Sequence, residues 1–267
     1  MHSTQSHNAL RYVRDACQSY QQELIGEEPL LIRIEDKPYS VVMRTPGEEI
    51  FHAAGFCLSE GLVDRPDDLA TIGYCRQVDS NVVDVRLQPE RVKKVFSLLQ
   101  RRGFISQTSC GICGKELLED LSQILSPIID ENRIHVREAI ASVGQLVQGQ
   151  NLYKKTRGSH AVLLMDSQLE VLSLAEDVGR HNALDKAIGK VFMTRQLENA
   201  QLAVLSSRIS YELVQKAGRA GLSILLSMSH PTALAVELGE KLNMSLACVG
   251  DKAGLLVFCG DERFIRE

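Results

Sequence analysis

Hydrophobic and polar residues follow one pattern early in the chain and another in its second half. Between residues 30 and 87, short β-favouring runs are separated by turn residues, whereas after residue 160 apolar strand-like runs alternate with longer amphipathic segments. The first pattern is typical of hairpins, and the second of a sheet whose strands are connected by helices. The sequence therefore predicts a mixed α+β / α/β chain: a small β-rich N-terminal domain followed by a three-layer α/β domain with a largely parallel or mixed sheet.

The N-terminal half contains two predicted hairpins and two predicted helices. Asp36-Lys37-Pro38 and Asp79-Ser80 provide the turns of the hairpins, and Gly61 and Gly103 lie where the helices are expected to end. The expected elements are strands Leu30–Glu35 and Tyr39–Arg44, helix Gly47–Leu62, strands Thr71–Val78 and Asn81–Leu87, and helix Pro89–Arg102.

The C-terminal half alternates strands and helices. The expected elements are helix Arg137–Lys155, strands Ala161–Met165 and Glu170–Leu174, helix Asn182–Phe192, strand Leu202–Leu205, helix Tyr211–Ala220, strand Ser223–Met228, helix Pro231–Leu242, and strands Leu246–Val249 and Leu255–Phe258. The predicted organisation is a loose or partly helical arm at 1–28, a β-rich domain at 29–106, a cysteine loop with a connecting helix at 107–136, and an α/β domain at 137–267 that also holds the candidate cofactor-binding residues.

Composition and charge exclude several classes of function. The 267 residues are 44% hydrophobic, enough for a sizeable core, and the net charge of -4 gives no overall attraction to nucleic acids or membrane surfaces. No apolar stretch resembles a secretory signal or reaches membrane-spanning length, so we expect a cytoplasmic protein.

Cys110 and Cys113 form the most reactive-looking motif of the chain. They lie in Ser109-Cys110-Gly111-Ile112-Cys113-Gly114, where a glycine follows each cysteine, directly before Lys115 and a helix-like stretch. A helix N-terminus and a neighbouring cation both favour the nucleophilic thiolate. The chain has seven cysteines, an odd number that argues against a disulfide framework, and Cys57, Cys75, Cys248 and Cys259 lie in apolar runs as expected for small buried residues. The residues alone leave three roles open for the cysteine pair: disulfide exchange, half of a zinc site, or covalent sulfur carriage.

A second polar stretch, Glu176–Lys186, lies where a strand passes into a helix. Ligands of α/β sheets usually bind at such corners, because side chains and free backbone N–H groups converge beyond the strand ends. On the expected helix His181 shares a face with Asp185, and Asn182 with Lys186. A capped helix start with solvated ion pairs is the alternative, and the density of polar residues and glycine favours a binding site.

Two further corners resemble the first. Ser206–Ser210, which includes Ser207 and Arg208, precedes one helix, and Ser229–Thr232 precedes the next, with Pro231 expected at the first helical position. Helix capping explains either corner alone. Together they would present helix N-termini, hydroxyls and Arg208 at one sheet edge, which suits phosphate groups, and His160 at the opening of a strand could lie nearby.

These strings closely resemble the FdhD family, the formate dehydrogenase accessory sulfurtransferases. The resemblance is carried by Ser109–Gly114 (SCGICG) and Glu176–Lys186 (EDVGRHNALDK) and covers nearly everything from Leu30 onward. Further matching segments are Arg44–Gly47, Gly55–Gly61, Gly158–Ala161 and Pro231–Leu238.

The resemblance implies a cytoplasmic homodimer that takes persulfide sulfur from a cysteine desulfurase. The sulfur would pass to the molybdenum cofactor, in its bis-molybdopterin guanine dinucleotide form, before insertion into formate dehydrogenase. Cys110 would carry the persulfide and Cys113 would assist. The resemblance also implies a C-terminal domain like the cytidine deaminase fold without its zinc chemistry, and we expect no tightly bound structural metal. A non-catalytic chaperone of the same cofactor is the alternative.

The resemblance further implies a cofactor contact in the turn Val249-Gly250-Asp251-Lys252-Ala253-Gly254. The family's arginines are replaced here by Asp251 and Gly254, which leaves Lys252 as the only cation of the turn. Backbone N–H groups of Gly250 and Gly254 are expected to serve instead. Arg180, His181, Asn182, Asp185, Lys186, Ser207, Arg208 and His160 complete the expected pocket.

Overall fold

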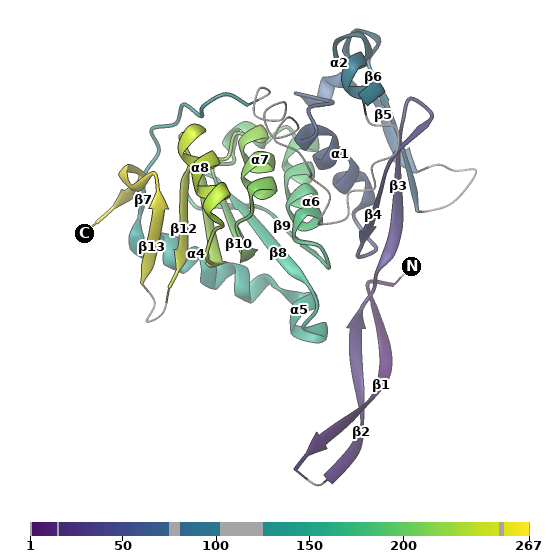
Figure 1. Cartoon of the computed structure of the whole chain (residues 1–267), viewed down its shortest axis with the longest axis vertical. Coiled ribbons are helices and arrows are strands. Elements are labelled where there is room, and N and C mark those ends of the chain that lie inside the picture. Colours follow the sequence, from purple (N-terminus) through teal and green to yellow (C-terminus); the bar gives the residue numbers. More distant parts are fainter. Residues whose placement is uncertain (1, 15, 75–80, 102–124, 251–253, 267) are drawn as a thin grey trace.

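The computed structural model describes residues 2–14, 16–74, 81–101, 125–250 and 254–266 (Figure 1). Cys110 and Cys113, most of the segment predicted as cysteine loop and connecting helix, and Asp251–Ala253 lie outside these residues. The described chain is a mixed α/β structure with several sheets, as the hydrophobic pattern predicts.

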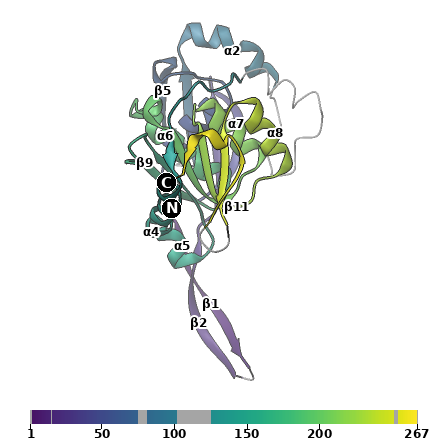
Figure 2. The same cartoon turned by 90° about the vertical axis from the view of Figure 1, so that its left-hand side faces the viewer.

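Two strands between Thr4 and Ile25 form a long β-hairpin, which we call the arm. Strands β1 (Thr4–Val13) and β2 (Ala16–Ile25) pair antiparallel along ten residues each and project from the body in both views (Figures 1 and 2). The expectation of a loose or partly helical arm was therefore wrong. The sequence between the two strands contains neither glycine nor asparagine, which would have indicated a turn. Arg14 adopts the left-handed conformation there, with φ 53°.

A four-stranded sheet with two helices forms the N-terminal lobe. Its strand order is β4-β3-β6-β5, and its elements are β3 (Glu28–Ile34), β4 (Lys37–Arg44), α1 (Glu49–Ser59), β5 (Leu69–Tyr74), β6 (Val82–Leu87) and α2 (Pro89–Arg101). The first turn is tighter than predicted, because Glu35 and Asp36 both adopt positive φ and close a two-residue connection. Pro38 consequently lies within β4, which is tolerated because β4 is an edge strand.

A six-stranded mixed sheet forms the centre of the C-terminal lobe. Its order is β13-β12-β11-β10-β8-β9, with β10, β11 and β12 parallel to one another and the other neighbouring pairs antiparallel. The strands are β8 (His160–Met165), β9 (Val171–Asp177), β10 (Leu202–Arg208), β11 (Ile224–Ser229), β12 (Ser245–Val249) and β13 (Leu255–Cys259). Helices α6 (Arg180–Met193), α7 (Tyr211–Arg219) and α8 (Ala233–Lys241) cover one face, and α4 (Val136–Gly149) lies on the other (Figure 1).

Three details of this lobe differ from the prediction. The helix expected over Arg137–Lys155 is divided at Gln150 into α4 and α5 (Asn151–Thr156), and the Glu176 carboxylate accepts the N–H groups of Leu152 and Tyr153 in the first turn of α5. A two-stranded pair, β7 (Ile134–His135) with β14 (Phe264–Ile265), is too short to leave a sequence pattern. Helix α8 begins at Ala233 rather than Pro231, because the Thr232 hydroxyl caps it.

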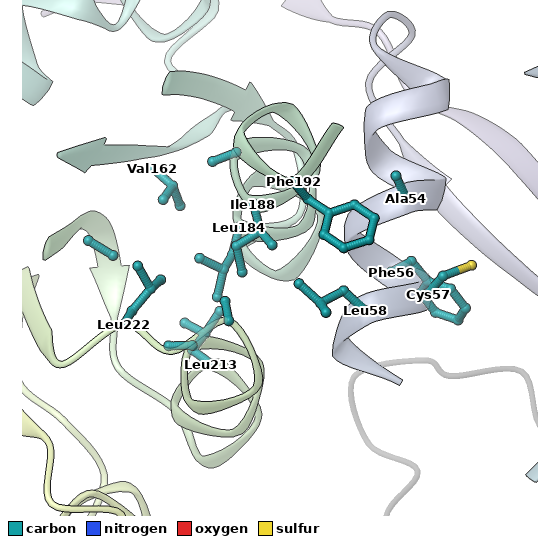
Figure 3. Close-up of a cluster of buried hydrophobic side chains, with 14 of the residues drawn as sticks. Ala54, Phe56, Cys57, Leu58, Val162, Leu184, Ile188, Phe192, Leu213 and Leu222 are labelled. Atoms are coloured by element: carbon teal, nitrogen blue, oxygen red, sulfur yellow. The ribbon is translucent and has the colours of Figure 1, made fainter. Parts of the chain in front are cut away.

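The two lobes share one hydrophobic core. Figure 3 shows Leu58 of α1 on the side that faces Phe192 of α6, and both side chains belong to the same buried cluster. The helices approach closely because glycines face the partner backbone: a Cβ at Gly55 would lie 1.9 Å from the carbonyl oxygen of Asp185. The domain boundaries predicted from sequence stay a prediction.

Among the described residues, none of the helices combines the length and the apolar character that crossing a membrane requires.

Candidate functional site

The polar corners predicted from sequence meet at one edge of the six-stranded sheet. The parallel strands β10, β11 and β12 end there, and the antiparallel neighbour β8 begins there. His160 on β8 is opposite Asp177, the last residue of β9, and Arg208 on β10 is opposite Ser229 on β11. The Ser206 hydroxyl accepts the Ala161 N–H at 2.8 Å and so ties the ends of β8 and β10 together.

Four basic side chains gather at this edge: Arg180 at the start of α6, its neighbour His181, Arg208 and His160. Burial lowers the pKa of Arg180, and the positive charge of Arg208 lowers it further. Burial also lowers the pKa of His160, with repulsion from Arg180 and His181 adding to the effect. These four residues, which we call the basic edge, therefore repel one another and would be stabilised by an anion.

One buried donor of the basic edge has no protein partner among the residues that the structure describes. Arg180 Nε is buried and makes no hydrogen bond there. A buried donor left unsatisfied is costly, whereas a phosphate oxygen could accept its hydrogen. The basic edge also lies at the N-terminal ends of α6 and α7, whose dipoles favour a negative charge.

Glu212 on α7 is the acidic partner of this cluster. His181 Nε2 lies 3.7 Å from the Glu212 carboxylate and 3.4 Å from the Ser210 hydroxyl oxygen. The contact with His181 is the main cause that lowers the pKa of Glu212 to about 2, so its carboxylate is ionised at neutral pH. Glu212 thus orients the His181 ring at the rim of the basic edge.

Lys186, a predicted pocket residue, is instead buried between the lobes. Its Nζ lies 2.7 Å from the Asp177 carboxylate and donates to the Thr45 carbonyl oxygen at 2.8 Å. Asp177 also accepts the Thr45 N–H at 3.0 Å and the Gly179 N–H at 2.9 Å. This buried group of contacts therefore fastens the end of β4 to the loop that leads into α6.

Asp185, the residue before Lys186, forms a second buried contact between the lobes. Its carboxylate accepts from Lys216 Nζ at 2.8 Å and from the Ser59 hydroxyl at 2.8 Å. Asn182 donates to Asp177 and to the Met43 carbonyl oxygen. The structure thus engages Asn182, Asp185 and Lys186 in contacts between the lobes, while Arg180, His181, Arg208 and His160 meet at the basic edge.

Thr45, Ser59 and Lys216 were missed by sequence reasoning. Each is buried or nearly so, and each pairs with a residue more than thirty positions away, so no local spacing reveals them. His52 on α1 is also buried in this region, and burial lowers its pKa well below the usual value, with Lys186 and Lys216 adding to the effect. The ring is therefore neutral and contributes no further charge.

The remaining predicted residues lie around the same edge. The Ser207 hydroxyl is buried and donates to the Arg208 carbonyl oxygen at 3.1 Å. Val249 ends β12, and the Gly250 N–H donates to the Gly254 carbonyl oxygen at 2.8 Å. The Gly250 N–H thus closes the turn within the protein, and the cofactor contact expected at this turn stays a prediction.

The cysteines within the described residues differ in exposure. Cys57 and Cys248 are buried, as predicted, and burial raises the pKa of Cys57 to about 12. Cys259 is half-buried, and Cys17 on the arm is exposed. Cys75, Cys110 and Cys113 lie outside the described residues.

The fold and the geometry of the site define a class of protein: a mixed α/β protein with a basic site at the ends of its strands. A model of the FdhD/NarQ family matches residues 25–265, so the chain belongs to the FdhD/NarQ family. It is 36% identical to the sulfur carrier protein FdhD of Streptomyces avermitilis, over 94% of this chain and 92% of the relative. It is 37% identical to the sulfur carrier protein FdhD of Mycobacterium tuberculosis, over 84% of each chain.

A solved structure has the same fold. The crystal structure of a candidate formate dehydrogenase accessory protein from Desulfotalea psychrophila superposes with a TM-score of 0.78, covering 98% of this chain and 99% of that chain at 21% identity. The resemblance stated from the sequence strings is therefore confirmed at the level of the family.

Proposed function

We propose that this chain is a sulfur carrier whose Cys110 holds sulfur as a persulfide for delivery to the molybdenum cofactor. Membership of the FdhD/NarQ family and relatives named sulfur carrier protein FdhD support the carrier role. We choose the molybdenum cofactor as the acceptor because of the basic edge, where Arg180 Nε is buried and lacks a hydrogen-bond acceptor among the described residues. A guanylated, pyrophosphate-bearing acceptor provides the negative charge that this edge favours.

The loading step is a thiol exchange. The Cys110 thiolate attacks the outer sulfur of a persulfide on a cysteine desulfurase, a new S–S bond forms, and the donor's S–S bond breaks to release its cysteine thiolate. The persulfide proton exchanges with water. Gly111 directly after Cys110, and Gly114 after Cys113, carry no side chain and leave space for the incoming sulfur.

The delivery step breaks the S–S bond of Cys110. The outer sulfur becomes a sulfide ligand of molybdenum, two electrons come from the reduced metal, and Cys110 returns to its thiolate form. The acceptor is bis-molybdopterin guanine dinucleotide, bound as substrate with phosphates at Arg180, His181 and Arg208. His160, Ser207 and the turn Val249–Gly254 complete the pocket in this proposal.

The location and the partners form part of the same proposal. The chain acts in the cytoplasm, and formate dehydrogenase receives the sulfurated cofactor. Cys113 assists Cys110, and the C-terminal lobe has the cytidine deaminase arrangement without its zinc chemistry.

Mass spectrometry after incubation with a cysteine desulfurase and cysteine tests the carrier step. We expect one added sulfur atom on the peptide containing Cys110, absent in Cys110→Ser and retained in Cys17→Ser, which removes an exposed thiol of the arm. No adduct on Cys110 while the donor turns over would refute persulfide carriage and leave the cofactor chaperone. An adduct on Cys113 alone would assign the carrier role to that residue.

A further inference from the structure

Among the described residues, nothing packs against the arm for most of its length. Residues of β1 and β2 are exposed almost throughout, including Leu10 at 63%, Tyr12 at 71% and Val13 at 55%. Its base is attached to the body through the Gln22 side chain, which donates to the Lys155 carbonyl oxygen. An isolated two-stranded hairpin is at best marginally stable in water, so a surface that covers the tip would stabilise the arm.

The tip of the arm carries apolar side chains on both of its faces. Directly opposed residues share a face: Tyr12 is paired with Cys17 on one, and Val13 with Ala16 on the other. Tyr20, 47% exposed, lies on the same face as Val13. Such a ribbon is suited to insertion between two walls rather than to packing on a single flat surface.

A hollow of about 1030 Å³ on the C-terminal lobe has two such walls. Val136 and Ile140 of α4 form one, and Leu255 and Val257 of β13 with Phe264 and Ile265 of β14 form the other. All six side chains are partly exposed. The hollow exists because α4 covers β8, β10 and β11 and leaves the sheet face near β13 open.

The backbone beside the hollow is also open for pairing. Strand β13 ends the six-stranded sheet, and within residues 2–14, 16–74, 81–101, 125–250 and 254–266 no strand pairs with its outer edge. Exposed sheet edges of this kind accept an added strand through main-chain hydrogen bonds. The arm offers outer edges of its own, since β1 and β2 pair only with each other in the same part of the chain.

The arm of one molecule does not cover the hollow of the same molecule. It points away from the six-stranded sheet in both views, and β13 lies at the far end of that sheet from β9 (Figures 1 and 2). A ten-residue strand spans roughly 34 Å, which is long enough to reach a neighbouring molecule. The arm also lies almost wholly outside the part of the chain that the family model matches, residues 25–265.

We propose that the arm of one copy docks into the hollow between α4, β13 and β14 of a second copy. Reciprocal exchange of two arms uses both hollows and closes a twofold dimer rather than a filament. Tyr12, Val13 and Tyr20 enter the hollow, and an arm strand adds to the edge of β13. This inference concerns an interaction surface and is independent of the sulfur chemistry.

Photocrosslinking of the full chain tests the contact. We place benzoylphenylalanine at position 12 in unlabelled protein, mix it with ¹⁵N-labelled protein, and map the adducts by mass spectrometry. Adducts that join an unlabelled arm to labelled peptides containing residues 136–140 or 255–265 are the expected result. Adducts confined to one copy, or joining arm to arm, would overturn the proposal.

Light scattering across a wide range of protein concentration tests the two surfaces separately. Tyr12→Asp on the arm and Ile140→Asp in the hollow should each weaken dimerisation by about tenfold or more, because both bury a charge in an apolar contact. Val41→Asp, at a side chain 50% exposed on β4, is the matched control and should leave the dimer unchanged. Circular dichroism confirms that each variant is folded.

Every other outcome of this measurement counts against the proposal. A monomer at all concentrations, or a dimer that neither folded variant weakens, would refute it. Loss of the dimer in Tyr12→Asp but not in Ile140→Asp would show that the arm docks elsewhere.

Discussion

Single residues of the Glu176–Lys186 string serve two different surfaces. Arg180 and His181 lie at the basic edge, whereas Asp185 and Lys186 turn inward and are 2% and 1% exposed. The sequence predicts a polar corner correctly but gives no sign of this division. Lys216 and Ser59, which surround Asp185, come from distant parts of the chain, and only the packing of α6 between α1 and α7 brings them together.

Removing the Asp185 carboxylate should strongly destabilise the protein. Asp185→Ala leaves Lys216 Nζ buried without its carboxylate, and breaking a buried pair in this way typically costs about 3–5 kcal/mol in the free energy of unfolding. Urea unfolding followed by circular dichroism measures the difference. Asp67→Ala, which removes the partner of Arg195 at the exposed surface, is the control and should change little. Equal losses in the two variants would contradict the importance of burial.

Replacing Arg180 should weaken binding of guanine nucleotides. Arg180→Gln keeps much of the side-chain volume and removes the charge, and charge-assisted hydrogen bonds contribute about 1.5–3 kcal/mol, so we expect a Kd for GDP at least about tenfold higher. Isothermal titration calorimetry measures the change. Arg65→Gln, at a side chain 75% exposed on the other lobe, should bind as the unaltered protein does. Unchanged affinity in Arg180→Gln would remove the basic edge from the acceptor site.

At the scale of elements, the contact between α1 and α6 decides how the lobes fit. Both helices are visible in the sequence pattern, but their close approach is not, because it depends on Gly55 and Gly189 facing each other's backbones. A Cβ at Gly189 would lie 1.8 Å from the Phe51 carbonyl oxygen, a distance that only movement of a helix could relieve. Close packing thus depends on the absence of a side chain at two positions.

Alanine at Gly55, in the contact between the helices, and alanine at Gly144, outside that contact, should change the stability of the protein in opposite directions. Gly55→Ala should lower the melting temperature markedly, because overpacking of a well-packed contact costs about 1–3 kcal/mol or more. Gly144→Ala, in α4 with nothing within 4 Å of the added Cβ, should raise stability by about 0.5–1 kcal/mol through helix propensity. Differential scanning fluorimetry compares the two. A neutral Gly55→Ala would show that the helices can separate without loss.

At the scale of the whole molecule, the sequence predicts the order of elements better than their assembly. Most strands and helices lie within a few residues of their predicted positions, because hydrophobic periodicity determines them locally. The arm was missed because its strands are polar and its turn lacks glycine. The gathering of polar residues at the strand ends follows from the sequence because parallel strands bring their ends to one edge, whereas the buried ion pairs between the lobes depend on long-range packing.

Asp64 joins the lobes by an interaction that should be lost in acid. Partial burial alone would raise the pKa of its carboxyl, but hydrogen bonds from Arg91 and Arg219 lower it from 3.8 to about 2. Because the folded state binds the proton more weakly than the unfolded state, the stabilisation is complete above pH 3.8 and disappears as the pH falls through about 2.

Urea unfolding of the unaltered protein and Asp64→Asn at several pH values measures this loss. The unaltered protein should be the more stable of the two at pH 7, and the difference in the free energy of unfolding should shrink as the pH falls from 3.8 towards 2. A difference that is independent of pH would assign the effect of the substitution to packing instead of charge.

The hydrophobic core that runs from α1 through α6 to α7 has a consequence for how the chain breaks down. Neither half can retain its own interior once the other is removed, since each would expose the helix face that the other had covered. Heating should therefore give a single calorimetric peak, and limited protease digestion should leave intact chain or small peptides without a durable fragment of intermediate size.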